Sequence, residues 1–424
     1  MKSVLILGAN FAGLQAAAAL PRHRQVTVVD SASQFEWTPN IHEILSGVKQ
    51  ASSVALDRPK ILSRLGHRFI QAPVSGLDAQ ARTVTLGDGR TLAFDCCLLA
   101  TGLTHDYHQV PGAQAHTLGF RSAGEVVRIH AALQALLARD RPVQVTLIGG
   151  GYSGIEALGE LLRRHRHDPR LRIRVLERHP RLLAGLPEVI ARDIEALCAP
   201  YPVEIHCGVA LQAISASAVT LHTGPPLHSD LTLWCAGTTG PAFLRDSGLN
   251  LDARGMVPVD AHLQASSGAG IFAAGDLAAF EPALLKQAYH AMDMGTRAGS
   301  NIERHLRDQP LRPFMPAEKP VALAFGDLTT YLIQGQTVLA SPLLAMAKEA
   351  VYQLYMAQLS RSLPLAELTE GLFSRALGSV RNQLLPEISR LHLLRILRQS
   401  MVLQWGGFKD TEAFVRALVI SATR

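Results

Sequence analysis

Cysteine motifs, long apolar runs and repetitive tracts are all scarce in this sequence of 424 residues. It contains five cysteines, and none of them forms C-x-x-C or C-x-x-x-x-C. The sequence therefore predicts neither a zinc site nor a disulfide framework. We expect these cysteines to be small hydrophobic core residues. They are Cys96, Cys97, Cys198, Cys207 and Cys235.

No window reaches the roughly 18 apolar residues of a membrane-spanning helix. The first predicted strand begins at Ser3, which leaves no room for a cleavable signal peptide. With 48% hydrophobic and 18% charged residues, the composition is that of a soluble globular protein of two or three domains. We therefore expect a cytoplasmic protein that does not span a membrane.

The N-terminal residues predict a strand, a glycine-rich loop, a helix and a second strand that ends in an acid. The expected elements are a buried strand at 3–8, a helix at 14–20 and a strand at 25–29, followed by Asp30. This βαβ order is the context that a dinucleotide-binding fingerprint requires. The helix N-terminus would offer its N–H groups to a pyrophosphate.

Each residue type in this first glycine-rich loop (Gly8–Gly13) has an expected role. Gly8 makes the tight turn, Gly13 lets the helix pack on the strand, and Asp30 accepts hydrogen bonds from a ribose. Asn10 stands where a glycine usually lets the backbone approach phosphate. Because asparagine tolerates left-handed backbone, we expect the loop to keep its shape with this side chain near the phosphate.

A second copy of the pattern follows about 140 residues later and has all three glycines: Gly149, Gly151 and Gly154. The expected elements are a strand at 143–148, a helix at 155–164 and a strand at 171–176. Glu177 ends this last strand and favours the free 2′-hydroxyl of NADH, because a carboxylate repels a 2′-phosphate. The neighbouring Arg178 and His179 leave NADPH as an alternative.

Between and after the two loops lie a predicted β-hairpin (83–86 and 91–94), the turn Ala100-Thr101-Gly102 and the segment Gly270–Asp276. With these motifs the sequence resembles the two-dinucleotide flavoprotein reductases of the pyridine nucleotide-disulfide oxidoreductase superfamily. The resemblance implies that the turn and the late Gly275-Asp276 pair belong to an FAD domain. It also implies that an NAD domain is inserted between the two FAD segments.

The helix expected from Leu284 to about Ile302 refines this resemblance. It is similar to the quinone-site helix of type II NADH dehydrogenases. Its Lys-x-Ala-Tyr-x-Ala motif is closer to the ferroptosis-suppressor and apoptosis-inducing-factor-like NAD(P)H:quinone reductases. The resemblance implies that Lys286 and Gln287 border the flavin ring and the acceptor. A solvated helix lysine is the alternative for Lys286.

Two further residues carry alternatives of the same kind. By resemblance Glu156 lies near flavin and nicotinamide; helix capping is its alternative. Trp37 is expected as a wall of the flavin-facing cavity or as a core residue. For the basic run at 163–170 the default is a solvated loop, and contact with a cofactor phosphate is the alternative.

The C-terminal region resembles nothing specific. We expect helices at 341–359, 365–385 and 386–404. In the last of these, apolar residues surround the helix and Arg390, Arg395 and Arg398 interrupt them. Such a helix lies in a membrane interface, in a dimer or domain interface, or in the core. The net charge of +6 arises mainly in the last 64 residues, but a nucleic-acid partner is not expected.

The predicted fold class is α/β, with two Rossmann-like dinucleotide-binding domains and a helical C-terminal region. We expect an FAD-binding domain at 1–112 and 256–300, an NAD(P)H-binding domain at 113–255, an interface segment at 301–345 and the helical region at 346–424. The candidate catalytic residues are Glu156, Lys286 and Gln287. The candidate cofactor-binding residues are Gly8, Asn10, Phe11, Ala12, Gly13, Asp30, Trp37, Ala100, Thr101, Gly102, Gly149, Gly151, Gly154, Glu177, Gly237, Gly275 and Asp276.

The predicted function is hydride transfer from NADH to FAD and electron transfer to a quinone-like acceptor without redox-active cysteines. Three alternatives stay open: reduction of a protein electron carrier, a biosynthetic flavin oxidation, and a redox-sensing interaction protein. The C-terminus is expected to contact either the cytoplasmic face of a membrane or a second copy of the chain.

Overall fold

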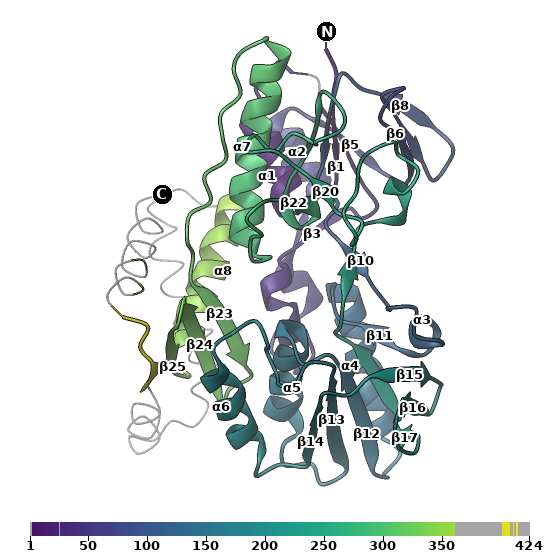
Figure 1. The fold of residues 1–424 in the computed structure, drawn as a ribbon, viewed down its shortest axis with the longest axis vertical. Coiled ribbons are helices and arrows are strands. Elements are labelled where there is room, and N and C mark those ends of the chain that lie inside the picture. Colours follow the sequence, from purple (N-terminus) through teal and green to yellow (C-terminus); the bar gives the residue numbers. More distant parts are fainter. Residues whose placement is uncertain (1, 25, 361–400, 408–409, 411–412, 414–424) are drawn as a thin grey trace. The chain divides into compact units, whose positions relative to one another are not determined.

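The structure is a computed structural model that describes residues 2–24, 26–360, 401–407, 410 and 413. The chain divides into two compact units, which are described separately (Figure 1). The first unit comprises Met1–Glu36, Ala55–Asp106 and Thr238–Ala317. The second comprises Trp37–Val54, Tyr107–Gly237 and the described residues from Glu318 onward.

A five-stranded parallel sheet in the order β21-β9-β1-β2-β5 forms the core of the first unit. Every residue of the central strands β1 and β9 is buried, as expected for a parallel sheet with both faces covered. The chain leaves β1 toward β2 on one side and returns to β9 on the other. Ligands bind outside the carboxyl ends of strands at such a switch point. The strands are β1 (Val4–Leu7), β2 (Val26–Asp30), β5 (Arg68–Gln71), β9 (Cys96–Leu99) and β21 (Ile271–Ala273).

Helix α1 (Phe11–Ala19) follows β1 and packs closely against α7 (Ala288–Leu306) (Figure 1). A Cβ atom on Gly295 would lie 2.1 Å from the carbonyl oxygen of Ala12, and one on Gly299 would lie 2.5 Å from that of Ala16. The absence of side chains at these two glycines therefore allows the two helix backbones to touch.

The predicted start of α7 at Leu284 is wrong. The helix begins at Ala288, and its N-cap residue Gln287 has an extended backbone. The ammonium group of Lys286 donates a hydrogen bond to the carbonyl oxygen of Asp276 over 2.7 Å. This contact holds the preceding segment against the turn at Asp276 instead of in a helical turn.

Smaller elements complete the first unit. The predicted hairpin is confirmed as antiparallel β7 (Thr83–Leu86) and β8 (Thr91–Ala93), with β6 (Val74–Asp78) beside β7. The others are β3 (Gln34–Glu36), β4 (Ala55–Asp57), α2 (Arg58–Leu65), β10 (Thr104–His105), β19 (Thr238–Thr239), η3 (Ala242–Leu244), β20 (Val257–Pro258), η4 (Gly275–Leu277) and β22 (Ala278–Ala279).

The second unit repeats the parallel architecture with the order β11-β18-β12-β13-β14. The two parallel sheets confirm the predicted α/β fold class with two Rossmann-like cores. The strands are β11 (Leu118–Gly119), β12 (Val143–Ile148), β13 (Leu171–Glu177), β14 (Val203–Cys207) and β18 (Leu231–Trp234). Its helices and remaining short strands are α3 (Ala113–His116), α4 (Ala123–Leu137), α5 (Tyr152–His165), α6 (Glu188–Cys198), β15 (Leu211–Ile214), β16 (Ala218–Leu221) and β17 (Leu227–His228).

An antiparallel sheet, a helix and two 3-10 helices complete the second unit. The sheet has the order β23-β24-β25-β26, and its first strand packs on α5. The elements are η1 (Thr38–Ile44), η2 (Ala51–Val54), β23 (Val321–Phe325), β24 (Thr329–Gln334), β25 (Thr337–Ala340), α8 (Leu344–Ser360) and β26 (Met401–Gln404). Helix α8 confirms the helix predicted at 341–359.

The helix predicted at 386–404 is wrong at its C-terminal end. Met401–Gln404 forms strand β26, because its backbone groups pair antiparallel with β25. The rest of that prediction and the helix predicted at 365–385 lie outside the described residues. Among the helices that the structure describes, none is long and apolar enough to cross a bilayer.

Candidate dinucleotide sites and a buried charge cluster

The first glycine-rich loop has no room for side chains at its two glycines. Gly8 has a φ of +93°, and a Cβ atom there would lie 2.3 Å from the carbonyl oxygen of Ala100. A Cβ atom on Gly13 would lie 1.8 Å from the carbonyl oxygen of Gly8. Ala100 opens the predicted Ala-Thr-Gly turn, so this turn packs directly on the loop. The sequence motifs are thus brought together at the carboxyl end of β1.

Asp30 is positioned by the loop and by a cation that the sequence did not indicate. One oxygen of its carboxylate accepts a hydrogen bond from the N–H of Ala9 over 2.7 Å. The other lies 2.7 Å from the guanidinium group of Arg58, which is only 5% exposed. Arg58 stands 28 residues after Asp30 in the sequence, outside any motif, so nothing in the local pattern pointed to it.

Asn10 stabilises the loop through side-chain hydrogen bonds and not through the left-handed backbone that was expected. Its backbone has φ −97° and ψ −146°, which is not a left-handed conformation. Its side-chain amide donates to the carbonyl oxygen of Glu36 over 3.1 Å and accepts from the N–H of Glu36 over 3.1 Å. The asparagine therefore ties the loop to β3.

Lys286 and Gln287 lie at the turn that contains Asp276. The ammonium group of Lys286 contacts the carbonyl oxygens of Asp276 and Ala278, and burial lowers the pKa of Lys286. Lys286 precedes α7 and is therefore not a helix lysine, but it is exposed, so the alternative of a solvated lysine stays a prediction. Both polar atoms of the Gln287 amide, and the hydroxyl of Thr101, are buried without a hydrogen-bond partner. Orphaned buried groups of this kind are usually satisfied by a bound molecule or water, so this unit fits a polar cofactor.

The second glycine-rich loop (Gly149–Gly154) shows the same close packing. Gly149 has a φ of +103°, and a Cβ atom on Gly154 would lie 1.9 Å from the carbonyl oxygen of Gly149. Above Gly151, in contrast, a Cβ atom would meet nothing within 4 Å. The fingerprint needs open space at this position, because the pyrophosphate approaches the backbone there.

Glu177 has both carboxylate oxygens occupied. One accepts from the N–H of Gly150 over 2.6 Å. The other accepts from the backbone N–H of His179 over 2.7 Å and lies 2.6 Å from its Nδ1. The nearby Arg181 donates to the backbone carbonyl oxygens between 182 and 186. Its guanidinium group therefore stabilises this loop.

The basic run at 163–170 is not simply a solvated loop. Arg166 forms a bidentate ion pair with Asp327, with nitrogen-to-oxygen distances of 2.6 and 2.9 Å. Arg163 lies 3.6 Å from the carboxylate of Glu160. These carboxylates therefore form ion pairs with guanidinium groups for which contact with a cofactor phosphate was the alternative prediction.

Glu156 faces a lysine from the far end of the sequence. Its carboxylate accepts from Lys348 over 2.9 Å and lies 3.7 Å from Nδ1 of His42. Burial raises the pKa of Glu156. Helix α5 is capped by Gly151 and Glu156 is the fifth residue after it, so the capping alternative is wrong. No spacing rule could reveal Lys348, which lies 192 residues away.

Trp37 is packed against α8. Its ring stacks on Tyr355 with centroids 5.5 Å apart, and Tyr352 lies at 6.2 Å. The indole N–H donates to the side chain of Asn40 over 3.0 Å. With 1% of its surface exposed, Trp37 has the environment of a core residue.

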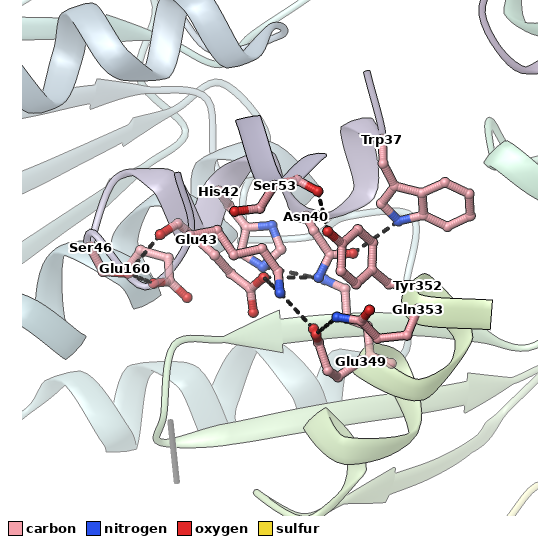
Figure 2. A network of polar contacts seen from close by, with 12 residues as sticks. Trp37, Asn40, His42, Glu43, Ser46, Ser53, Glu160, Glu349, Tyr352 and Gln353 are labelled. Carbon is pink, nitrogen blue, oxygen red and sulfur yellow. Dashed lines mark hydrogen bonds and ion pairs between the residues drawn. The ribbon is translucent and has the colours of Figure 1, made fainter. Parts of the chain in front are cut away.

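These contacts belong to one buried charge cluster of the second unit, formed by η1 and the residues after it, α5 and α8 (Figure 2). Lys49 lies 2.7 Å from Glu349 and 3.4 Å from Glu43. The cluster consists of Glu43, Glu156, Glu160, Glu349, Lys49, Lys348, Arg163 and His42, and each of these side chains is at most 18% exposed. Only Glu156 among them is a candidate site residue that the sequence predicted.

The cysteines have the character of core residues. All five are free, and three of them are buried. Burial raises the pKa of each thiol, to about 12 for Cys96, Cys198 and Cys235. A reactive cysteine needs the opposite shift, because the thiolate is the nucleophile.

The chain is similar to four known proteins or families in sequence or fold. The sequence profile described as pyridine nucleotide-disulphide oxidoreductase matches residues 2–295. The chain is 28% identical to demethylphylloquinone reductase NdbB of Synechocystis sp. over 368 residues, which cover 82% of this chain and 91% of that protein. It is 22% identical to type II NADH:quinone oxidoreductase of Staphylococcus aureus over 77% of this chain and 88% of that protein. The fold matches NDH2 from Plasmodium falciparum in complex with NADH, with a TM-score of 0.73, 12% identity and coverage of 92% and 100%.

Proposed function

Since the chain belongs to the pyridine nucleotide-disulphide oxidoreductase family, we propose that it is an FAD-dependent NADH:quinone oxidoreductase. The observation that carries this proposal is the pair of glycine-rich loops, each closing a βαβ unit of its own parallel sheet. One enzyme with two dinucleotide loops can bind the electron donor and a redox cofactor at the same time.

We assign FAD to the first loop and NADH to the second. In support, the first unit also contains the Ala100 turn, Asp276 and the unsatisfied amide of Gln287. The second has a carboxylate, Glu177, at the position that favours a free 2′-hydroxyl. Bound FAD would accept a hydride from NADH and deliver two electrons to an acceptor.

The chain's own residues supply position and charge in this scheme. The ammonium group of Lys286 would stabilise negative charge at the pyrimidine edge of the flavin. The side-chain amide of Gln287 would form hydrogen bonds with the ring or with the acceptor. Glu156 would hold or release a proton, because burial raises the pKa of its carboxyl group.

A quinone is the electron acceptor that the relatives favour. The two relatives described above are named as a demethylphylloquinone reductase and an NADH:quinone oxidoreductase. The raised thiol pKa values offer no dithiol route for the electrons. Electrons would therefore leave the flavin directly.

We further propose that the C-terminal region (346–424) contacts the cytoplasmic face of a membrane, where quinones reside. The basis is the sequence at 386–404, where arginines interrupt an apolar stretch. A second copy of the chain is the other candidate for this contact.

An anaerobic stopped-flow experiment tests the central proposal. NADH should bleach the flavin absorbance of the purified protein, and a soluble quinone should restore it in a second, separate step. The cofactor released on denaturation should be FAD. Stoichiometric FMN, or flavin that NADH reduces but no quinone reoxidises, would contradict the proposal.

A further inference from the structure

Among the residues that the structure describes, the buried charge cluster contains one carboxylate more than its cations can balance. Glu43, Glu156, Glu160 and Glu349 face Lys49, Lys348 and Arg163. The eighth member, His42, does not add a positive charge, because burial and the nearby lysines hold its pKa well below the usual range. An unbalanced charge in a buried site is costly, and such a site takes up a proton instead.

Distances to the cations indicate which carboxyl group holds that proton. The shortest carboxylate-to-cation distances are 2.7 Å for Glu349, 2.9 Å for Glu156, 3.4 Å for Glu43 and 3.6 Å for Glu160. Glu160 is also the least exposed of the four, at 1%. The group with the weakest cation contact and the deepest burial protonates most readily.

The hydrogen bonds of Ser46 agree with this assignment. Its hydroxyl contacts both the carbonyl oxygen of Glu43, at 3.1 Å, and the carboxyl group of Glu160 (Figure 2). Ser46 is the donor in both contacts, but its hydroxyl has one proton and can donate to only one of these oxygens at a time. While it donates to the Glu43 carbonyl oxygen, the Ser46 oxygen is able to accept a hydrogen bond from a protonated Glu160 carboxyl group. Burial raises the pKa of Glu160 to about 7.

We propose that Glu160 stores the proton that quinone reduction consumes and passes it on to Glu156. This inference rests on the proposed function. In the overall reaction NADH supplies two electrons and one proton to the quinone, so quinol formation needs one further proton. The O–H bond of Glu160 breaks and an O–H bond forms on Glu156. Glu156 then transfers this proton to the quinone oxygen, and a proton taken up from bulk solvent re-forms the O–H bond of Glu160.

The geometry provides the connection between the two carboxyl groups. Glu156 and Glu160 stand one turn apart on the same face of α5. Lys348 donates to Glu156, and its charge also acts on Glu160. The groups that interact with Glu160 are Arg163 from α5, Glu43 and Ser46 from the segment 38–54, and Lys348 from α8. Glu160 acts through Glu156 and is thus a positioning residue.

Infrared spectroscopy of the FAD-loaded protein tests the storage of the proton without any turnover. At about pH 6 wild type should show a protonated-carboxyl C=O band that weakens as the pH rises through about 7. The band should be absent from Glu160→Gln, which keeps a donor toward Ser46. The matched control Ser46→Ala should keep the band at a shifted frequency, because the carboxyl group remains. A missing band in wild type, or its loss in both variants, overturns the storage.

Stopped-flow measurements test the use of the proton. Flavin reoxidation by a soluble quinone should be roughly 10-fold or more slower in Glu160→Gln, and it should lose the pH dependence of wild type near pH 7. Reduction by NADH should be unchanged. Glu160→Asp should restore part of the rate, and Glu43→Gln should lower the pH midpoint, because the charge of Glu43 raises the pKa of Glu160.

The two proposals fail in different ways. If Glu160→Gln is reoxidised with the rate and pH profile of wild type, Glu160 delivers no proton. An unshifted midpoint in Glu43→Gln would contradict the charge balance described above. If no quinone reoxidises the wild-type flavin, the proposed function fails and delivery fails with it, while the infrared band still decides whether Glu160 stores a proton.

Discussion

Replacing Gly151 by alanine should weaken NADH binding without destabilising the protein. The backbone of Gly151 has φ −82° and ψ −166°, which alanine adopts freely, and the added methyl group would meet nothing within 4 Å. A glycine-to-alanine change at such a position typically stabilises a protein by ~0.4–1 kcal/mol. The same methyl group, however, would occupy the open space over the loop that the pyrophosphate needs.

The expected loss of affinity follows from the hydrogen bonds at stake. One charge-assisted hydrogen bond from the loop to phosphate contributes ~1.5–3 kcal/mol. Losing one should therefore raise the dissociation constant for NADH roughly 10- to 150-fold. Calorimetric titration of the FAD-loaded protein with NADH measures this, with thermal unfolding recorded on the same samples. The FAD content is the internal control, because the first loop is unchanged.

Gly154→Ala is the matched variant with the opposite expectation. Its Cβ atom would lie 1.9 Å from the carbonyl oxygen of Gly149, so the loop or helix α5 must shift. Such overpacking costs about 1–3 kcal/mol, which should appear as a lower melting temperature. The reasoning is refuted if Gly151→Ala binds NADH as wild type does, or if it melts lower than Gly154→Ala.

Four other outcomes are expected. NADH should reduce the flavin faster than NADPH does. Glu177→Gln should narrow this difference in rate, because it removes the repulsion of the 2′-phosphate but keeps an acceptor for the Gly150 N–H. A wild type that prefers NADPH would contradict the assignment of NADH to the second loop. Lys286→Ala should slow flavin reoxidation by quinone roughly 10- to 150-fold in stopped flow, with NADH binding unchanged; equal loss in both half-reactions would indicate general damage. Because the pKa of Glu160 is raised, the folded state binds one proton more than the unfolded state between about pH 4.5 and about 7, and the unfolding free energy should fall as the pH rises through this range. Glu160→Gln should flatten this decline in denaturant titrations. An unchanged slope would contradict a protonated carboxyl group on Glu160. Arg395→Glu with Arg398→Glu should reduce sedimentation with anionic vesicles and leave NADH-driven flavin reduction intact, since basic residues near an anionic surface each contribute about 1 kcal/mol; unchanged sedimentation would favour a contact between chains.

The fold was predictable because its signals are local. Each βαβ unit places a buried strand, a glycine-rich loop, a helix and an acid within about 35 residues, and the two units recur in the order that a two-dinucleotide protein requires. The errors arose where tertiary contacts override local pattern. The ammonium of Lys286 bonds to Asp276, and the helix begins only at Ala288; Met401–Gln404 pairs with β25 and becomes a strand.

The charge cluster was beyond sequence reasoning for a different reason. Several of its contacts join residues that are far apart in the sequence: Ser46 and Glu160 are 114 positions apart, and Lys49 and Glu349 are 300 positions apart. No periodicity or spacing relates such residues, and each charged side chain alone is typical of a solvated surface. Only the fold shows that they are buried together, and burial is what gives the extra carboxylate its chemistry.

The two acids of the fingerprints show where motif reasoning ends. Asp30 accepts the N–H of Ala9, and Glu177 accepts the N–H of Gly150, the second residue of each loop. Each acid therefore holds its loop closed before any ribose is bound. Its second oxygen contacts Arg58 in one unit and His179 in the other, and neither contact is part of the fingerprint. The spacing of the acid follows from the βαβ geometry, but the charge that a bound ribose would meet is set by these neighbours. Cofactor preference in this chain should therefore respond to His179 and Arg58 as well as to the acids themselves.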